Sequence, residues 1–262
     1  MLINVIFKFP NFQISKLKLG NWLIALIYKL VYVCNFKMNA LKGIMALLLM
    51  CLGIVSNAQQ YYRFKADVTI KEKKTDGKFN LTKGTLYYDI HNRKAVYDVS
   101  FPEKALIIIT DTAYISIVNG KRTSSRSSKE FLDFSLFNLC LTGKLDYYGL
   151  KNTPYTITKT EKEDSMIITT WSPPEKLKKT KGKIKVSLVN KKLFGVISYD
   201  PKGKTIAKQF FEEYIIVKTI AIPSRIVSFF YIGKTTATQI TEFKNIVINE
   251  TGNDTMYDHA LE

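Results

Sequence analysis

Cysteine is scarce in this chain of 262 residues, which has three cysteines in all. Cys34 and Cys51 fall within the first 58 residues, so Cys140 is the one cysteine in the remainder. A single thiol cannot form an internal disulfide bond, and the fold must therefore be stabilised by a hydrophobic core. Because Cys140 lies among apolar residues, we interpret it as a small core residue rather than a reactive thiol.

Histidine is scarcer still, with only His91 and His259. Neither has the spacing of a catalytic nucleophile or a metal site. Asp254 and Asp258 are close enough to His259 in sequence to ligate a metal with it, but a solvated tail explains them better. The acidic residues at 161–164 are best explained by solvent exposure. The sequence therefore predicts no catalytic residue, no metal and no cofactor, so we do not expect an enzyme.

Long apolar runs are also lacking, since Ile44–Val55 has twelve residues and a permanent membrane helix needs about 20. Lys42 precedes this run and the small residues Ser56-Asn57-Ala58 follow it, which together form a secretory signal over residues 38–58. We expect cleavage after Ala58 and export of the mature chain, with an uncleaved anchor as the alternative. Met38 opens a complete signal, so residues 1–37 are expected to be a mis-assigned upstream extension.

Acidic residues are too few to balance the basic ones, with 22 Asp and Glu against 39 Lys and Arg. The first 58 residues carry six lysines and no acid, so without them the net charge falls from +17 to +11. Anionic lipid head groups or an acidic partner would suit the lysine cluster near residue 180, although a solvated edge that resists aggregation is the commoner explanation. Nucleic acid is disfavoured by the export signal. The cluster comprises Lys176, Lys178, Lys179, Lys181, Lys183 and Lys185.

Alternation of apolar and polar residues with period two predicts many strands. In 62–71 the apolar side chains all fall on one face, and Asp76-Gly77 then predicts a hairpin turn. Gly84 is an expected bulge, because the apolar parity shifts across it. Ala105–Thr110 is apolar on both faces, so we expect it to be central and covered twice.

The stretch Lys183–Tyr231 predicts four further strands joined by short turns, with Pro223 at the start of the fourth. Short connections make neighbouring strands antiparallel, because parallel pairing needs a long crossover. Residues 59–249 should therefore form one mainly β domain, a single antiparallel sheet of about 11–12 strands curved into a half-open barrel. Residues 250–262 are expected to be a flexible tail.

One apolar segment interrupts the strands. Ser127 and Glu130 fit a capping box, Phe131–Leu141 follows with helical period, and Gly143 ends the helix. Apolar residues cover nearly its whole circumference, so the helix should be buried on most sides. We expect it to be a lid or plug on the concave side of the sheet.

A sheet of this size has more concave apolar surface than one short helix fills. We therefore expect a cavity for an apolar ligand, with an ordinary packed core as the alternative. We predict the lining residues from strand parity and from the helical segment. They are Phe64, Ala66, Val68, Leu86, Tyr88, Tyr97 and Val99 on the strands, and Phe134 and Phe137 in the helical segment.

Over Tyr62–Asn249 the chain resembles the LolA-like family of periplasmic outer-membrane lipoprotein carrier proteins. The segments that carry the resemblance are Gly84–Tyr88, Lys94–Pro102, Ile197–Lys204 and Ile222–Ile226. It implies a monomeric half-barrel that shelters the acyl chains of a lipoprotein between an inner-membrane donor complex and an outer-membrane acceptor.

This chain departs from the family pattern in two places. Only Gln59–Tyr61 precede the first strand, where the family has a longer helix, and the family's lid arginine has no clear counterpart, since Arg93 is about two residues out of place. Because a related member of the same superfold senses envelope stress, the alternative function is a sensor or interaction protein that binds a partner or lipid. A purely structural envelope protein is a third interpretation.

Overall fold

The structure, a computed structural model, describes residues 61–127 and 129–258. Strands dominate these residues. The first six are β1 (Arg63–Lys73), β2 (Phe79–Asp89), β3 (Lys94–Phe101), β4 (Ala105–Ile109), β5 (Ala113–Val118) and β6 (Lys121–Arg126). The remaining strands are β7 (Thr156–Glu163), β8 (Met166–Ser172), β9 (Ile184–Val189), β10 (Lys192–Tyr199), β11 (Thr205–Val217), β12 (Ile220–Ile232) and β13 (Thr235–Ile248).

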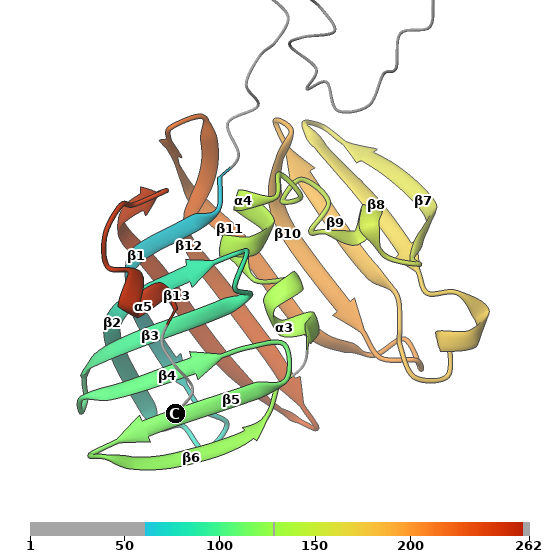
Figure 1. The fold of residues 1–262 in the computed structure, drawn as a ribbon. Coiled ribbons are helices and arrows are strands. Elements are labelled where there is room, and N and C mark those ends of the chain that lie inside the picture. The colour runs from blue at the N-terminus through green and yellow to red at the C-terminus, as the bar shows by residue number, and fades with distance from the viewer. Residues whose placement is uncertain (1–60, 128, 259–262) are drawn as a thin grey trace, which may run out of the picture. The chain divides into compact units, whose positions relative to one another are not determined.

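All thirteen strands belong to one antiparallel sheet, in the order β6-β5-β4-β3-β2-β1-β13-β12-β11-β10-β9-β8-β7 (Figure 1). The predicted half-open antiparallel barrel is confirmed, with slightly more strands than expected. The first described strand, β1, lies near the centre of the sheet, and from there the chain runs out to the β6 edge, crosses to the β7 edge, and returns to the centre. There β13 pairs with β1, for example Thr241 with Ile70.

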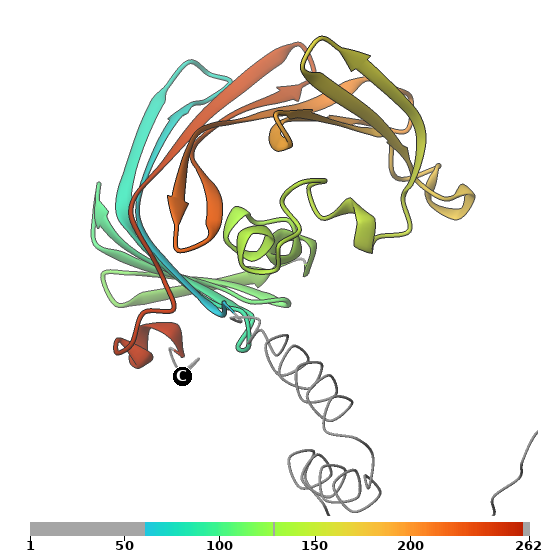
Figure 2. The same cartoon turned by 90° about the horizontal axis from the view of Figure 1, so that it is seen from above.

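The crossing segment between β6 and β7 contains the helices α3 (Lys129–Asp133), α4 (Leu136–Leu141) and η1 (Leu150–Asn152). A chain that passes from one edge of an open sheet to the other must run over one of its faces. Figure 2 shows this segment lying inside the curve of the sheet. Every residue of α4 is buried. The expected position of the helical segment is therefore correct.

The single helix predicted over Phe131–Leu141 is wrong in detail, because α3 and α4 are separated by Phe134 and Ser135. The Ser135 hydroxyl donates to the carbonyl of Leu132 at 2.7 Å and accepts from the backbone N–H of Asn138 at 3.4 Å. One side chain thus satisfies the end of α3 and caps the start of α4. Helix α3 begins at Lys129, and the side chain of Glu130 lies outside the described part of the chain.

Gly84 lies at the predicted bulge, since the β2–β3 register shifts between Lys83 and Gly84. A Cβ at this position would clash with the backbone of Asp98, which explains the glycine. Pro223 is inside β12 rather than at its start. It pairs with Tyr214 of β11, whereas the pairing with β13 begins only at Arg225, so Pro223 lies where β12 is paired on one side only.

Strand β4 is covered on both faces as predicted, although it is the third strand from the edge rather than central. Its Ile109 belongs to the core beneath α4, while Ile108 packs with Val96 and Ile115 on the outer face, beneath Met256.

Met256 belongs to α5 (Asp254–Tyr257), which packs on the outer face of β2 and β3. Tyr257 is fully buried, and the guanidinium of Arg63 lies 4.4 Å from the centre of its ring. This differs from the flexible tail expected over 250–262. Residues 1–58, which include the predicted signal segment, lie outside the described part of the chain, and so does His259. Within that part, no helix is both long and apolar enough to cross a bilayer.

Candidate ligand cavity

A cavity of about 420 Å³, which we call the inner cavity, lies between the concave face of the sheet and the segment containing α3 and α4. Its lining is mainly apolar and aromatic. The sheet contributes Val68, Ile70, Tyr97, Phe211, Ile226, Phe230 and Phe243, and the helical segment contributes Phe131, Phe134, Leu136 and Phe137. The size and the lining are typical of small-molecule sites in proteins.

Four of the nine residues predicted to line a cavity do so: Val68, Tyr97, Phe134 and Phe137. Tyr97 is partly buried and packs against the core, and burial raises the pKa of its hydroxyl. These four side chains come from two strands and the helical segment, so the structure brings together residues up to about seventy positions apart in sequence.

The other five, Phe64, Ala66, Leu86, Tyr88 and Val99, are buried but do not line the inner cavity. The reason is that α4 lies directly on β1 and covers this part of the concave face. The Phe137 ring is 4.5 Å from the Tyr88 ring and 6.2 Å from the Phe64 ring, measured between centroids. Among the five predicted residues that do not line the inner cavity, Phe64 and Tyr88 therefore pack against the lid.

A strip of polar side chains crosses the floor of the inner cavity and was not predicted. It consists of Gln209 on β11, Ser228 on β12, and Gln239 and Thr241 on β13. Gln209 pairs in register with Ser228, and Ser228 with Gln239. The Gln209 amide donates to Ser228 at 3.4 Å, and the Gln239 amide donates to Thr241 at 3.1 Å. Parity puts Gln209 on the face of Phe211, but the sequence alone does not tell which face is concave.

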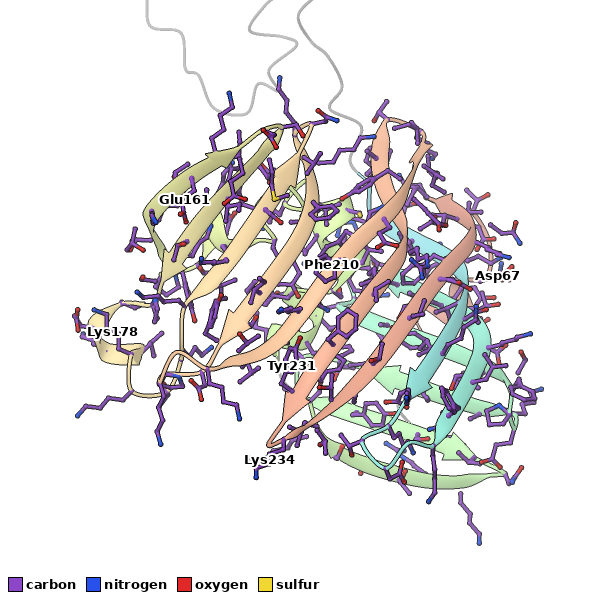
Figure 3. The ribbon with its side chains drawn as sticks, turned by 180° about the vertical axis from the view of Figure 1, so that it is seen from behind. Asp67, Glu161, Lys178, Phe210, Tyr231 and Lys234 are labelled. Atoms are coloured by element: carbon purple, nitrogen blue, oxygen red, sulfur yellow. The ribbon has the colours of Figure 1, made fainter. Side chains whose placement is uncertain are left out.

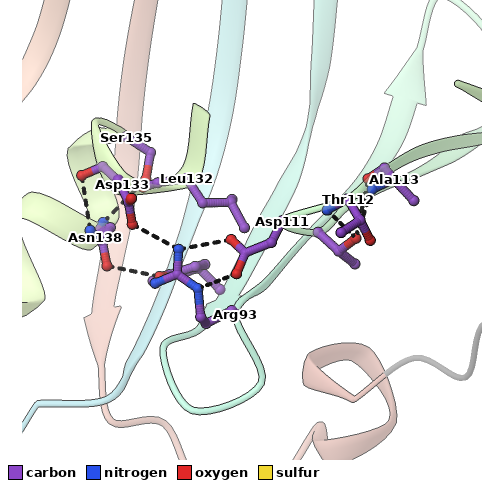
Figure 4. Close-up of polar contacts among 10 residues, drawn as sticks. Arg93, Asp111, Thr112, Ala113, Leu132, Asp133, Ser135 and Asn138 are labelled. Carbon is purple, nitrogen blue, oxygen red and sulfur yellow. Dashed lines mark hydrogen bonds and ion pairs between the residues drawn. The ribbon is translucent and has the colours of Figure 1, made fainter. Parts of the chain in front are cut away.

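Arg93, on the turn between β2 and β3, connects the sheet to the helical segment (Figure 4). Its guanidinium donates to both carboxylate oxygens of Asp111, at 2.6 and 2.8 Å, and its Nη2 also donates to Asp133 at the end of α3, at 2.7 Å. These bonds hold the pKa of Asp111 below its usual range and raise that of Arg93. Arg93 is therefore bonded to the end of α3 despite its two-residue offset in sequence.

A second polar link joins β2 to the lid. The Tyr88 hydroxyl donates to the side-chain carbonyl of Asn138 at 2.9 Å, and the Asn138 amide donates to the backbone carbonyl of Asp133 at 3.0 Å. Asn138 is buried in α4, so its polar atoms depend on these partners. Burial raises the pKa of Tyr88, so its hydroxyl keeps its proton, and can donate, to a higher pH than an ordinary tyrosine.

The rings of Phe134 and Tyr148 are stacked with their centroids 5.5 Å apart, and they form a wall between the inner cavity and a second one. This second cavity has a volume of about 710 Å³ and lies between the crossing segment and the ends of β9 to β11. The Tyr148 hydroxyl bonds to Gln209 at 2.9 Å, which ties the wall to the polar strip. Tyr148 has a φ of 53° and is followed by Gly149 at 71°.

Within residues 61–127 and 129–258, no group of three or more His, Cys, Asp or Glu side chains could hold a metal ion. Cys140 is buried, and burial raises the pKa of its thiol to about 12, so it is a poor nucleophile. The chemistry that the cavities offer is apolar contact together with a few hydrogen bonds.

The sequence of this chain matches no protein-family model and no curated protein. Its fold, in contrast, is similar to those of solved structures. A LolA superfamily protein from Nitrosomonas europaea has a TM-score of 0.52 at 11% identity, over 77% of this chain and 93% of that chain. An outer membrane lipoprotein-sorting protein domain from Vibrio parahaemolyticus has a TM-score of 0.54 at 11% identity, over 81% and 96%.

A DUF1329 family protein from Desulfovibrio piger is similar to the same degree, with a TM-score of 0.53 at 11% identity over 77% of this chain and 91% of that chain. At such identities the likeness concerns the fold alone. The described part of the chain therefore has the LolA-like fold, as the sequence predicts.

Proposed function

We propose that this protein is a non-enzymatic periplasmic carrier, which binds the acyl chains of lipoproteins in its cavities and moves them from the inner to the outer membrane. The observation that carries the proposal is an apolar cavity beneath a lid whose polar links to the sheet are few and identifiable. Such links can break and re-form without unfolding the sheet. The proposed partners are an acylated lipoprotein or lipid, a donor complex and an acceptor, with the carrier acting as a monomer.

The inner cavity suits an acyl ligand in both size and character. Burying acyl chain contributes about 0.8 kcal/mol per CH₂, so a short buried length already binds firmly but reversibly. The polar strip suits the linkage end of such a ligand, because its amide and hydroxyl groups can bond to an ester or amide oxygen. A pure hydrocarbon would leave these groups without a new partner.

The crossing segment suits the role of a lid. Helices α3 and α4 are short and are interrupted at Ser135. Short helices gain little stability from their own hydrogen bonds and depend on tertiary contacts. A ligand that displaces Phe131 or Phe134 would therefore move the segment at modest cost. The loss of the Arg93–Asp133 contact would accompany this opening.

The proposal is tested by extracting the protein recovered from the cell envelope and analysing the extract by mass spectrometry, followed by titration with a fluorescent acyl probe. We expect acyl lipid or lipoprotein in the extract. Ile226→Trp should fill the inner cavity and reduce probe affinity at least about tenfold, since Ile226 lines it. Val227→Trp is the matched control, because Val227 pairs with Phe210 on the outer face of the same strand.

Correctly folded protein that carries no acyl lipid and binds no probe would refute the carrier proposal. Recovery of a partner polypeptide, in place of lipid, would favour the sensor alternative. Equal loss of probe binding in the two tryptophan variants, with unchanged circular dichroism, would mean that the probe does not enter the inner cavity. In that case the acyl site would not be the one described above.

A further inference from the structure

A groove of about 950 Å³ lies on the outer face of the sheet, across the ends of β7 to β10. It is bordered by the turn at 200–203 and by the loop between β8 and β9, which contains η2 (Glu175–Leu177). Figure 3 views this face, with Glu161 and Lys178 labelled one above the other at the β7 end of the sheet. We call it the lysine groove, after its residues Lys159, Lys178, Lys181, Lys183, Lys185 and Lys202.

Four of the six lysines of the sequence cluster at 176–185 line this groove, namely Lys178, Lys181, Lys183 and Lys185. In β9, Ile184 and Val186 pack into the interior, so Lys183 and Lys185 point outward. Lys159 of β7 and Lys202 of the β10–β11 turn are brought to the same place only by the fold. Thr158, Thr170 and Ser172 add hydroxyl groups to the lining.

The groove is strongly positive, because its lining has six lysines and two carboxylates. Both carboxylates already have partners. Glu161 accepts from Lys159 at 2.7 Å, and Asp200 accepts from the backbone N–H groups of its own turn at 2.8 and 2.9 Å. Lys178 pairs with Glu175 just outside the groove, and the charge of Lys185 helps to lower the pKa of Glu161. Among the described residues no carboxylate forms an ion pair with Lys183, Lys185 or Lys202, so these three ammonium groups can approach an external anion.

The groove and the second cavity share a wall, formed by Lys181, Gly182 and 199–201. At Gly182 a Cβ would clash with the carbonyl oxygens of Tyr199 and Asp200, so the loop lies directly against β10. The wall is therefore thin, with lysines on its outside and apolar side chains on its inside. We call the edge of the second cavity at this wall the rim. Ile206, which is 44% exposed, also lines the second cavity.

We propose that the lysine groove binds the phosphate head groups of anionic phospholipid at a membrane surface, and that this rim is where the protein contacts the bilayer. Charge complementarity identifies the occupant: several lysines side by side suit a surface of closely spaced phosphates better than a single ligand. Head groups on the outside of the thin wall would place the acyl region next to the second cavity. Only this last consequence rests on the proposed carrier function.

The experiment measures binding of the protein recovered from the cell envelope to vesicles of phosphatidylglycerol and phosphatidylcholine, compared with phosphatidylcholine alone. The groove variant replaces Lys178, Lys183, Lys185 and Lys202 by Gln. The control variant replaces four exposed lysines outside the groove, Lys83, Lys104, Lys121 and Lys244, so that both variants have the same net charge. Thermal unfolding and acyl-probe binding are measured on all three proteins.

We expect the groove variant to bind anionic vesicles at least about tenfold more weakly than the control variant, since each lysine near an anionic surface contributes separately. Added salt should abolish most of the difference. Equal losses in the two variants would overturn the proposal, because net charge and not the groove would then govern binding. It would also be overturned if the wild-type protein bound both vesicle types equally.

The two proposals fail in different ways. If the protein loses its preference for anionic vesicles but still binds the acyl probe, the carrier proposal stands and the membrane-contact proposal is refuted. If the protein prefers anionic vesicles but binds no acyl probe, the membrane-contact proposal stands and the carrier proposal is refuted.

Discussion

Arg93 Nη2 lies 2.7 Å from Asp133 Oδ1, which joins the turn between two sheet strands to the last residue of the first lid helix. The same guanidinium holds Asp111 with two bonds, so Asp111 fixes the orientation of the arginine. Both ion-paired side chains are about one third exposed, which limits the stability that they contribute. The value of the contact lies in positioning the lid.

Replacing Arg93 with Gln should lower the free energy of unfolding by about 1–2 kcal/mol, because three charge-assisted bonds are lost at a partly exposed site. Hydrogen exchange of the α4 amides should speed up more than exchange in β1. Arg225→Gln is the control, since Arg225 pairs with Glu212 on β11, away from the lid. Equal exchange changes at α4 in the two variants would show that Arg93 does not hold the lid.

The contribution of Asp111 should depend on pH. Its pKa is lowered from 3.8 because Arg93 donates to it, so the carboxylate stabilises the fold above that unfolded value. The contribution is lost as the pH falls through the lower, folded pKa. Urea unfolding of the wild type and Asp111→Asn should therefore differ most near neutral pH, and converge below about pH 4. A difference that persists undiminished at about pH 2 would contradict this assignment.

Tyr88→Phe should destabilise the protein by about 1–3 kcal/mol, because the side-chain carbonyl of buried Asn138 loses its donor. Tyr148→Phe removes a comparable bond to Gln209, but at the edge of a cavity where water can replace it. Its cost should be below about 1 kcal/mol. Urea unfolding of both variants provides the comparison, and a larger cost for Tyr148→Phe would count against the proposed role of Asn138.

Phe131→Ala should weaken acyl-probe binding about fivefold while changing stability little. Phe131 lines the inner cavity but is 51% exposed, so roughly half of the benefit of burying a phenylalanine is available to a ligand. Phe79→Ala, at a residue 78% exposed in the β1–β2 hairpin, is the matched control. Probe affinity unchanged by both substitutions would place the ligand elsewhere.

The fold class of this protein and most of its strands can be predicted from the sequence, because the period-two pattern and the turn residues are local properties. Gly84 and the apolar segment at 131–141 were interpretable for the same reason. Local patterns give the two faces of a strand, and they do not say which face is concave or what covers it.

The position of the lid and the residues that line the cavities depend on tertiary structure. The edge-to-edge path of the crossing segment places α4 on β1, so Phe64 and Tyr88 became supports of the lid and not cavity residues. Arg93 and Asp133 are 40 positions apart, and no periodicity links them. The polar strip and the lysine groove likewise combine residues from several strands. Such sites depend on how strands are ordered in space, and that order is set by the packing of the whole chain.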